Sequence, residues 1–285
     1  MHRGLVAVTV LAAVTAVACG DGGRQDLVVE GTPPAAPYRG PLYVPTEFRD
    51  ENTPEAERAA SGAAGRALEC DGEIYQGDGP DGWSRRDGGA TPEEGLNLWF
   101  DMFEPGLPEQ GYRVEREEAD RVLYSYDVGG RTKVAVVVAK DQKERPGWGP
   151  ETSASCDPAE LPASFTNHQS YEIWTDRAGR RAPVAEISSY PGAEHCDWQR
   201  AHFLHLGRGQ DERSYARDPD GVLDADVMLT APYDGDVRMP AGAHDTGYRY
   251  GERQLWLTDD RSTAYVRTHD GVEAWPLVKQ GLGCR

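Results

Sequence analysis

Three histidines surround a cysteine in the stretch AEHCDWQRAHFLH, near the middle of the chain. His195, His202 and His205 could ligate a metal ion, and one of them could activate Cys196 as a nucleophile. The three histidines would share a face on a helix, but a strand would put His202 and His205 on opposite faces. The stretch has no helix cap and lacks both HExxH and Cys-x-x-Cys spacing. We therefore expect a strand, with no metal, no cofactor and no catalytic residue.

The chain begins with a segment typical of secretory signals. Residues 1–18 read MHRGLVAVTVLAAVTAVA, a weakly positive start followed by small apolar residues. The apolar run is shorter than the roughly 20 residues that cross a membrane, so it predicts a cleaved signal peptide. The sequence AVAC at residues 16–19 resembles a bacterial lipobox, whose cysteine receives a diacylglycerol. The resemblance implies a palmitate-type lipid anchor at Cys19, and ordinary cleavage near Ala18 is the alternative.

The cysteine count supports an exported protein. Lipidation of one of the five cysteines would leave an even number, and an oxidising compartment would pair them. We predict the disulfides Cys70–Cys156 and Cys196–Cys284, because each pair would then enclose one structural module. Cys196 is on this view a bridge and neither a nucleophile nor a metal ligand.

The charge of the chain narrows the possible partners. The sequence has 48 acidic and 30 basic residues, which gives a formal net charge of −18. A surface of this sign repels nucleic acid and anionic lipid headgroups, so we expect neither as a partner. The expected contact with the membrane is the lipid anchor alone, at the extracytoplasmic face.

The first half of the chain predicts a tether followed by an α+β module. Residues 19–50 are rich in Pro and Gly and show no hydrophobic period, which predicts a lipidated tether. In the module, residues 51–157, Thr53-Pro54 would begin a helix over 53–69. Thr91-Pro92-Glu93-Glu94 is a capping box, and the apolar spacing after it predicts a second helix that Pro105-Gly106 ends.

Alternating apolar residues over 121–139 predict a β-hairpin in the same module. We expect a three-residue loop that pairs Tyr124 with Val134, because a strict two-residue turn would mismatch the apolar faces. A later strand would end at Cys156. A helix on a curved antiparallel sheet resembles the cystatin-like or NTF2-like shape, and the resemblance implies nothing beyond that shape.

The second half of the chain predicts a linker, residues 158–169, and a mostly β module, residues 170–285. The stretch 254–278 has three short apolar runs separated by polar turns, which is typical of a meander. Asp270-Gly271 predicts a two-residue turn that pairs Val266 with Trp275. The overall fold class is therefore α+β, a helix-on-sheet module followed by a mostly β module.

Other patterns that could carry chemistry are weak. The chain has no Gly-x-Ser-x-Gly elbow, P-loop or dinucleotide fingerprint. Its acidic turns lack EF-hand spacing, so we interpret them as solvated turns. Aromatic residues of the second module could form a surface that stacks on sugars or partner chains, or could simply fill a β core: Trp174, Trp198, Tyr248, Tyr250, Trp256, Tyr265 and Trp275.

The arrangement as a whole resembles uncharacterised two-domain lipoproteins of actinobacteria. The resemblance rests on the signal with Cys19, the Pro/Gly tether, Cys-Asp-Gly-Glu from Cys70, His-Cys-Asp-Trp at 195–198, and Cys284. It assigns no activity. We expect a non-enzymatic cell-envelope lipoprotein that binds a protein or glycan partner, and the alternative is a secreted hydrolase with an unrecognised site.

Overall fold

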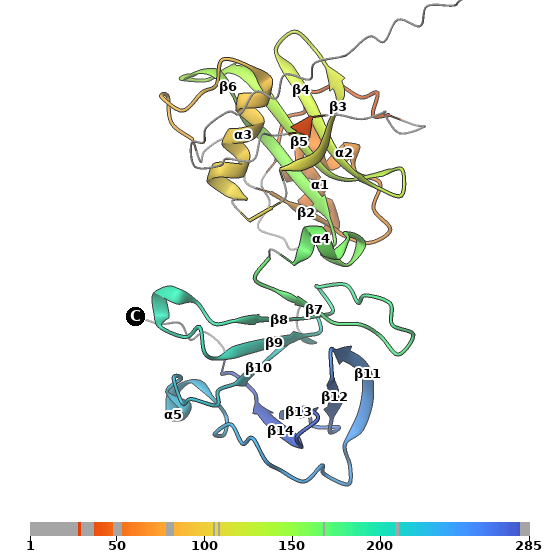
Figure 1. The fold of residues 1–285 in the computed structure, drawn as a ribbon, viewed down its shortest axis with the longest axis vertical. Helices are drawn as coiled ribbons and strands as arrows, with labels where there is room; N and C mark the ends of the chain where they lie inside the picture. Colours follow the sequence, from red (N-terminus) through yellow and green to blue (C-terminus); the bar gives the residue numbers. More distant parts are fainter. Residues whose placement is uncertain are drawn as a thin grey trace, which may run out of the picture.

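The computed structural model describes two packed regions that follow one another along the chain (Figure 1). It describes residues 28–29, 37–47, 53–77, 83–104, 106–107, 109–167, 169–208 and 211–279. The predicted signal peptide, Cys19 and Cys284 lie outside these residues. The fold is α+β, as predicted, with a few helices and three sheets.

The first region is built on a six-stranded sheet with the strand order β1-β3-β4-β5-β6-β2. Its pairings are antiparallel except for β1, which lies parallel to β3. The strands span Val28–Val29 (β1), Ile74–Gln76 (β2), Gln110–Glu117 (β3), Arg121–Val128 (β4), Arg131–Gln142 (β5) and Arg145–Cys156 (β6).

Helix α3, Pro92–Phe103, covers one face of this sheet. It begins as predicted, because the Thr91 hydroxyl accepts from Glu94 N at 3.3 Å. The Glu94 carboxylate reaches back to Ala90 N at 2.5 Å, one residue before the position that a standard capping box would use. Bulky helix residues such as Trp99 then pack on alternate positions of β4 and β5.

Small residues cover the other face of the sheet. Helices α1, Pro54–Ala60, and α2, Gly62–Ala67, replace the single helix predicted over 53–69. The chain bends at Gly62, where a Cβ would stand 2.9 Å from Thr152 Cγ2, so the helix lies very close to the sheet. Leu42 is buried in the same cluster, so part of the segment expected as a tether packs on the module.

The predicted register of the β4–β5 hairpin is wrong by two residues. Tyr124 pairs with Val136, not with Val134. The turn is the two-residue Gly129-Gly130, and a bulge that adds Lys133 restores the match between the apolar faces. The Lys133 ammonium is buried and bonds Glu160 Oε2 at 2.5 Å and the Glu69 carbonyl at 2.9 Å, which are contacts that the hairpin sequence alone does not contain.

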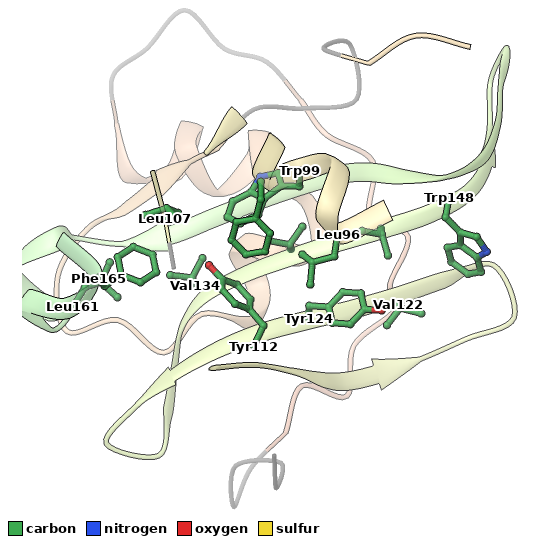
Figure 2. Close-up of a cluster of buried hydrophobic side chains, with 13 residues drawn as sticks. Leu96, Trp99, Leu107, Tyr112, Val122, Tyr124, Val134, Trp148, Leu161 and Phe165 are labelled. Atoms are coloured by element: carbon green, nitrogen blue, oxygen red, sulfur yellow. The ribbon is translucent and has the colours of Figure 1, made fainter. Parts of the chain in front are cut away.

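The segment expected as a linker, 158–169, contributes to the first core. It contains a 3₁₀ turn, η2 (Pro158–Glu160), and a short helix, α4 (Ala163–Thr166). Leu161 and Phe165 are buried against the α3 face of the sheet. Figure 2 places both at one end of that core, beside Leu107.

The second region packs two four-stranded antiparallel sheets around a core of its own. One sheet has the order β10-β9-β8-β7, with strands Glu172–Ile173 (β7), Ile187–Pro191 (β8), His202–Leu206 (β9) and Arg213–Arg217 (β10). The other has the order β11-β12-β13-β14, with strands His244–Tyr250 (β11), Arg253–Leu257 (β12), Thr263–Arg267 (β13) and Val272–Pro276 (β14). A short helix, α5, spans Ala225–Met228, and a 3₁₀ turn, η3, spans Glu194–Cys196.

The predicted register of the β13–β14 hairpin is also wrong by two residues. Trp275 pairs with Ala264, and Val266 pairs with Glu273. Thr268 N donates to the Gly271 carbonyl at 2.8 Å, so the turn centres on 269–270 and not on 270–271. This register places the large Trp275 side chain opposite the small Ala264, and both residues are fully buried.

The Cys70–Cys156 disulfide is confirmed. It joins the segment after α2 to the end of β6, with the two Cα atoms 5.3 Å apart. Cys196 is also disulfide-bonded. The predicted partner of Cys196 is Cys284, which lies outside the described residues, so that pairing stays a prediction.

Candidate functional site

The three histidines of the 193–205 stretch do not converge. His195 lies exposed in η3, whereas His202 and His205 belong to β9. The strand puts these two on opposite faces of the sheet, as predicted. Within the described part of the chain, no three His, Cys, Asp or Glu side chains are placed to hold a metal ion.

His205 carries a polar cluster on the outer face of the β7–β10 sheet. Its Nε2 atom bonds the Tyr190 hydroxyl, and its Nδ1 atom lies 3.0 Å from Glu212 Oε1 and 3.3 Å from Ser214 Oγ. A hydrolytic triad needs the nucleophile and the carboxylate on opposite ring nitrogens. Here the serine and the carboxylate share one nitrogen, so the cluster does not have the geometry of a serine hydrolase.

His202 faces the interior between the two sheets. Its Nδ1 atom is buried without a hydrogen-bond partner in the described structure. Burial lowers the pKa of His202, and Arg253 and Arg217 lower it further, while Glu172 opposes them. The ring is therefore neutral near pH 7, and its half-buried side chain lies on the face of β9 that carries Leu204 and Leu206.

The aromatic residues singled out from the sequence do not form an exposed platform. Trp174 and Trp275 are fully buried in the second core. The remaining five are half-buried: Trp198, Tyr248, Tyr250, Trp256 and Tyr265. One residue of the acidic turns interpreted as solvated, Asp218, is instead buried, and its carboxylate accepts from the backbone N–H groups of Val222 and Leu223.

A cavity of about 330 Å³ opens at one end of the first core. Its walls come from the C-terminal half of α3, the β2–β6 edge of the sheet, the η2–α4 segment and the start of the second region. Most of the lining is apolar or aromatic. Figure 2 shows three of the lining residues: Leu107 and Phe165 lie at one end of the core, and Trp99 lies nearer its middle.

The shape of the cavity follows from the residues on either side of it. Near the start of α3, a Cβ at Gly95 would lie 3.1 Å from the backbone of Trp148 and Gly149, so helix and sheet nearly touch there. One turn further along, the helix carries the bulky Trp99. The strand opposite offers only Ser153 and Ser155, which pair with Val136 and Val134. Small side chains under a large one leave the space open.

Some buried polar atoms of the first core have no hydrogen-bond partner in the described structure. The indole Nε1 of Trp99 is buried and donates to no atom in the described structure. The Tyr112 hydroxyl, in the same core, is also buried without a partner. Burial raises the pKa of Tyr112 and of Tyr171, and in both cases the nearby Glu104 carboxylate raises it further. Because the Trp99 Nε1 atom and the Tyr112 hydroxyl are both closed to solvent, each unpaired donor costs about 1–3 kcal/mol.

The sequence did not reveal this cavity. Trp99 belongs to the apolar spacing that predicted the helix after Thr91, and its side chain is buried. The lining residues Tyr75, Ser155 and Tyr171 come from segments far apart in the chain. The only usable signal was the row of small residues in ETSASC, opposite an aromatic helix face.

No family model, no curated protein and no solved structure matches the chain. The resemblance to actinobacterial lipoproteins therefore stays a prediction.

Proposed function

We propose that this protein is a non-enzymatic binding protein of the cell envelope that holds a small organic ligand in the cavity beside Trp99. The observation that carries the proposal is a mainly apolar cavity of about 330 Å³ that four aromatic residues line: Tyr75, Trp99, Phe165 and Tyr171. Sites for small molecules are commonly concave and apolar with a few placed polar groups.

The lining favours binding over catalysis. It includes one carboxylate, Glu104, and neither a histidine nor a cysteine. The described lining also carries Ser153 and Ser155, but it has no histidine that could activate a serine hydroxyl as a nucleophile. The alternative of a secreted hydrolase finds no support at the His205 cluster, whose hydrogen bonds do not follow the triad pattern.

The structure also bears on the two expected partner classes. A glycan is less well supported, because the seven aromatic residues considered for stacking are buried or half-buried. The apolar cavity supports a small organic molecule instead. A protein partner stays a prediction from the sequence.

Attachment to the extracytoplasmic face of the membrane through Cys19 is part of the proposal. None of the helices in the described part of the chain has the length and apolar character that a membrane crossing requires. Replacing Cys19 with Ser should release the protein from cells into the medium, as immunoblotting of cell and medium fractions would measure. Wild-type protein found in the medium without acyl mass would contradict the anchor.

A dye-binding experiment tests the cavity. N-phenyl-1-naphthylamine is uncharged and fluoresces strongly in apolar surroundings, so titrating it into the purified protein should give saturable binding. Ser155→Phe should abolish this signal because the ring would occupy the cavity, whereas Ser262→Phe, at an exposed turn of the second region, should not. Equal dye binding by wild type and a folded Ser155→Phe variant would refute the proposed function.

A further inference from the structure

The cavity beside Trp99 is lined by aromatic rings and by uncharged side chains. Four of the lining residues are aromatic: Tyr75, Trp99, Phe165 and Tyr171. The others are aliphatic, small or neutral polar residues, with the single exception of Glu104. Burial raises the pKa of Tyr75 and of Tyr171, so both hydroxyls keep their protons and stay uncharged at physiological pH. The walls therefore offer a ligand apolar faces and neutral hydrogen-bonding groups.

An anionic group would find no compensating charge in this cavity. Among the residues that the structure describes, Lys, Arg and His are absent from the lining. The Arg181 guanidinium donates to the Leu161 carbonyl and to Thr166 Oγ1, and Arg181 does not line the cavity. Burying a carboxylate or a phosphate without a cation is costly in a site of low polarity. A fatty acid could therefore enter only with its carboxylate left outside in water.

A cationic group is disfavoured by the loss of its hydration. The rings attract a cation, because an aromatic face carries partial negative charge. Glu104 already has an interaction partner in the structure, so it offers a ligand no free counter-charge. Rings beside a carboxylate that is already engaged return only part of the hydration that a buried ammonium group loses. An uncharged ligand avoids this cost and keeps the contacts with the rings.

The size of the cavity and its aromatic walls favour a compact ring system. The volume of about 330 Å³ lies near the lower end of the roughly 300–1,000 Å³ that pockets for small organic molecules span. Planar rings gain offset-stacked or edge-to-face contacts with aromatic walls beyond the area that they bury. A flexible alkyl chain lacks these contacts and loses rotational freedom when it is bound.

We infer that the cavity takes an uncharged molecule built on one or two planar rings, with a hydroxyl or carbonyl group that meets the neutral polar side chains of the wall. Ser155 and Gln169, both half-buried lining residues, can each donate to and accept from such a group. The inference rests on the proposed binding function and names the ligand class.

A set of probes that share one ring system and differ mainly in charge tests the inference. At pH 7, 1-naphthylmethanol is neutral, 1-naphthoate is an anion and 1-naphthylmethylammonium is a cation. We count only the dye signal that Ser155→Phe removes. The alcohol should displace N-phenyl-1-naphthylamine at an at least tenfold lower concentration than either ion does. The neutral chain alcohol n-octanol should be a few-fold weaker than 1-naphthylmethanol, because it has no ring to stack.

A lysine added to the wall tests why anions are excluded. Gln169→Lys should bring 1-naphthoate to within about threefold of the alcohol, because the new ammonium group supplies the missing counter-charge. Ser170→Lys is the matched control, since Ser170 is the exposed neighbour and does not line the cavity, and it should keep the wild-type order. Unchanged dye affinity in both variants would show that the cavity is intact.

The outcomes separate the ligand class from the binding function. Displacement by either ion, or by n-octanol, at the same concentration as 1-naphthylmethanol would overturn the inference, while the dye result keeps the binding function. A wild-type order of the probes in Gln169→Lys would also overturn it, because a missing positive charge would then not be what excludes anions. Absence of dye binding would overturn the binding function itself.

Discussion

Opposite kinds of helix pack the two faces of the six-stranded sheet. Helix α2 presents only Gly and Ala to its face, and it lies so close that a Cβ at Gly62 would collide with Thr152. Helix α3 presents Leu, Trp and Phe, touches the sheet near Gly95 and leaves a cavity beside Trp99. The small residues of α2 pack closely on the sheet and leave no internal space there. The large residues of α3 meet sheet side chains of uneven size, and this mismatch leaves a cavity.

The largest expected effect on stability comes from removing the Cys70–Cys156 disulfide, which lies on the α2 side of the sheet. Replacing Cys70 and Cys156 together with Ala should lower the free energy of unfolding by about 4–5 kcal/mol, because the bond closes a long loop in the unfolded chain. Urea denaturation of the purified variant measures this. A loss under about 1 kcal/mol would mean that the α2 face holds its position without the bond.

Crowding the close-packed face should have the next largest effect. Gly62→Ala places a Cβ 2.9 Å from Thr152 Cγ2 at a residue with φ of +55°. We expect a loss of about 2–5 kcal/mol, the sum of left-handed strain and overpacking. Gly129→Ala is the matched control, because Gly129 has a φ of +61° with no atom within 4 Å. It should lose only the strain, about 1–2 kcal/mol, and equal losses in both variants would argue against tight packing under α2.

Filling the α3 side should have a much smaller effect. Ser155→Phe enlarges a side chain by far more than Gly62→Ala does, yet it points into open volume. We expect a change within about 1 kcal/mol of zero, since cavity filling is often neutral or stabilising. Thermal unfolding of Ser155→Phe and of Gly62→Ala under the same conditions measures the difference. A larger loss of stability in Ser155→Phe than in Gly62→Ala would show that the cavity is closed in solution.

The smallest effect is a pH dependence at the edge of the cavity. Burial raises the pKa of Asp157, although hydrogen bonds from Ala159, Val184 and Tyr75 partly oppose it. The folded protein therefore holds this proton at pH values where the unfolded chain has lost it, so ionisation costs stability as pH rises from about 4 through the folded pKa. The stability of Asp157→Asn relative to wild type should increase over this window in paired unfolding curves. An opposite trend would show that the hydrogen bonds outweigh burial.

Features set by neighbours in the chain could be predicted from the sequence. The caps at Thr53 and Thr91 and the apolar face of α3 formed as expected. The strand that places His202 and His205 on opposite faces of the sheet also formed as expected. The pairing of Cys70 with Cys156 followed from module order, because the bond joins the two ends of one module.

Features that depend on contacts across the fold could not be predicted. Both hairpin registers were wrong by two residues, because an even shift keeps the apolar faces matched and leaves the choice to tertiary contacts. The bulge at Lys133 lets its ammonium bond the Glu69 carbonyl and the Glu160 carboxylate, and both of these residues lie outside the hairpin. The cavity beside Trp99 is of the same kind. The sequence alone determined which side chains face inward, because that follows from local period, and only the tertiary structure decided that Trp99 meets two serines, because volume is set by which elements are brought together.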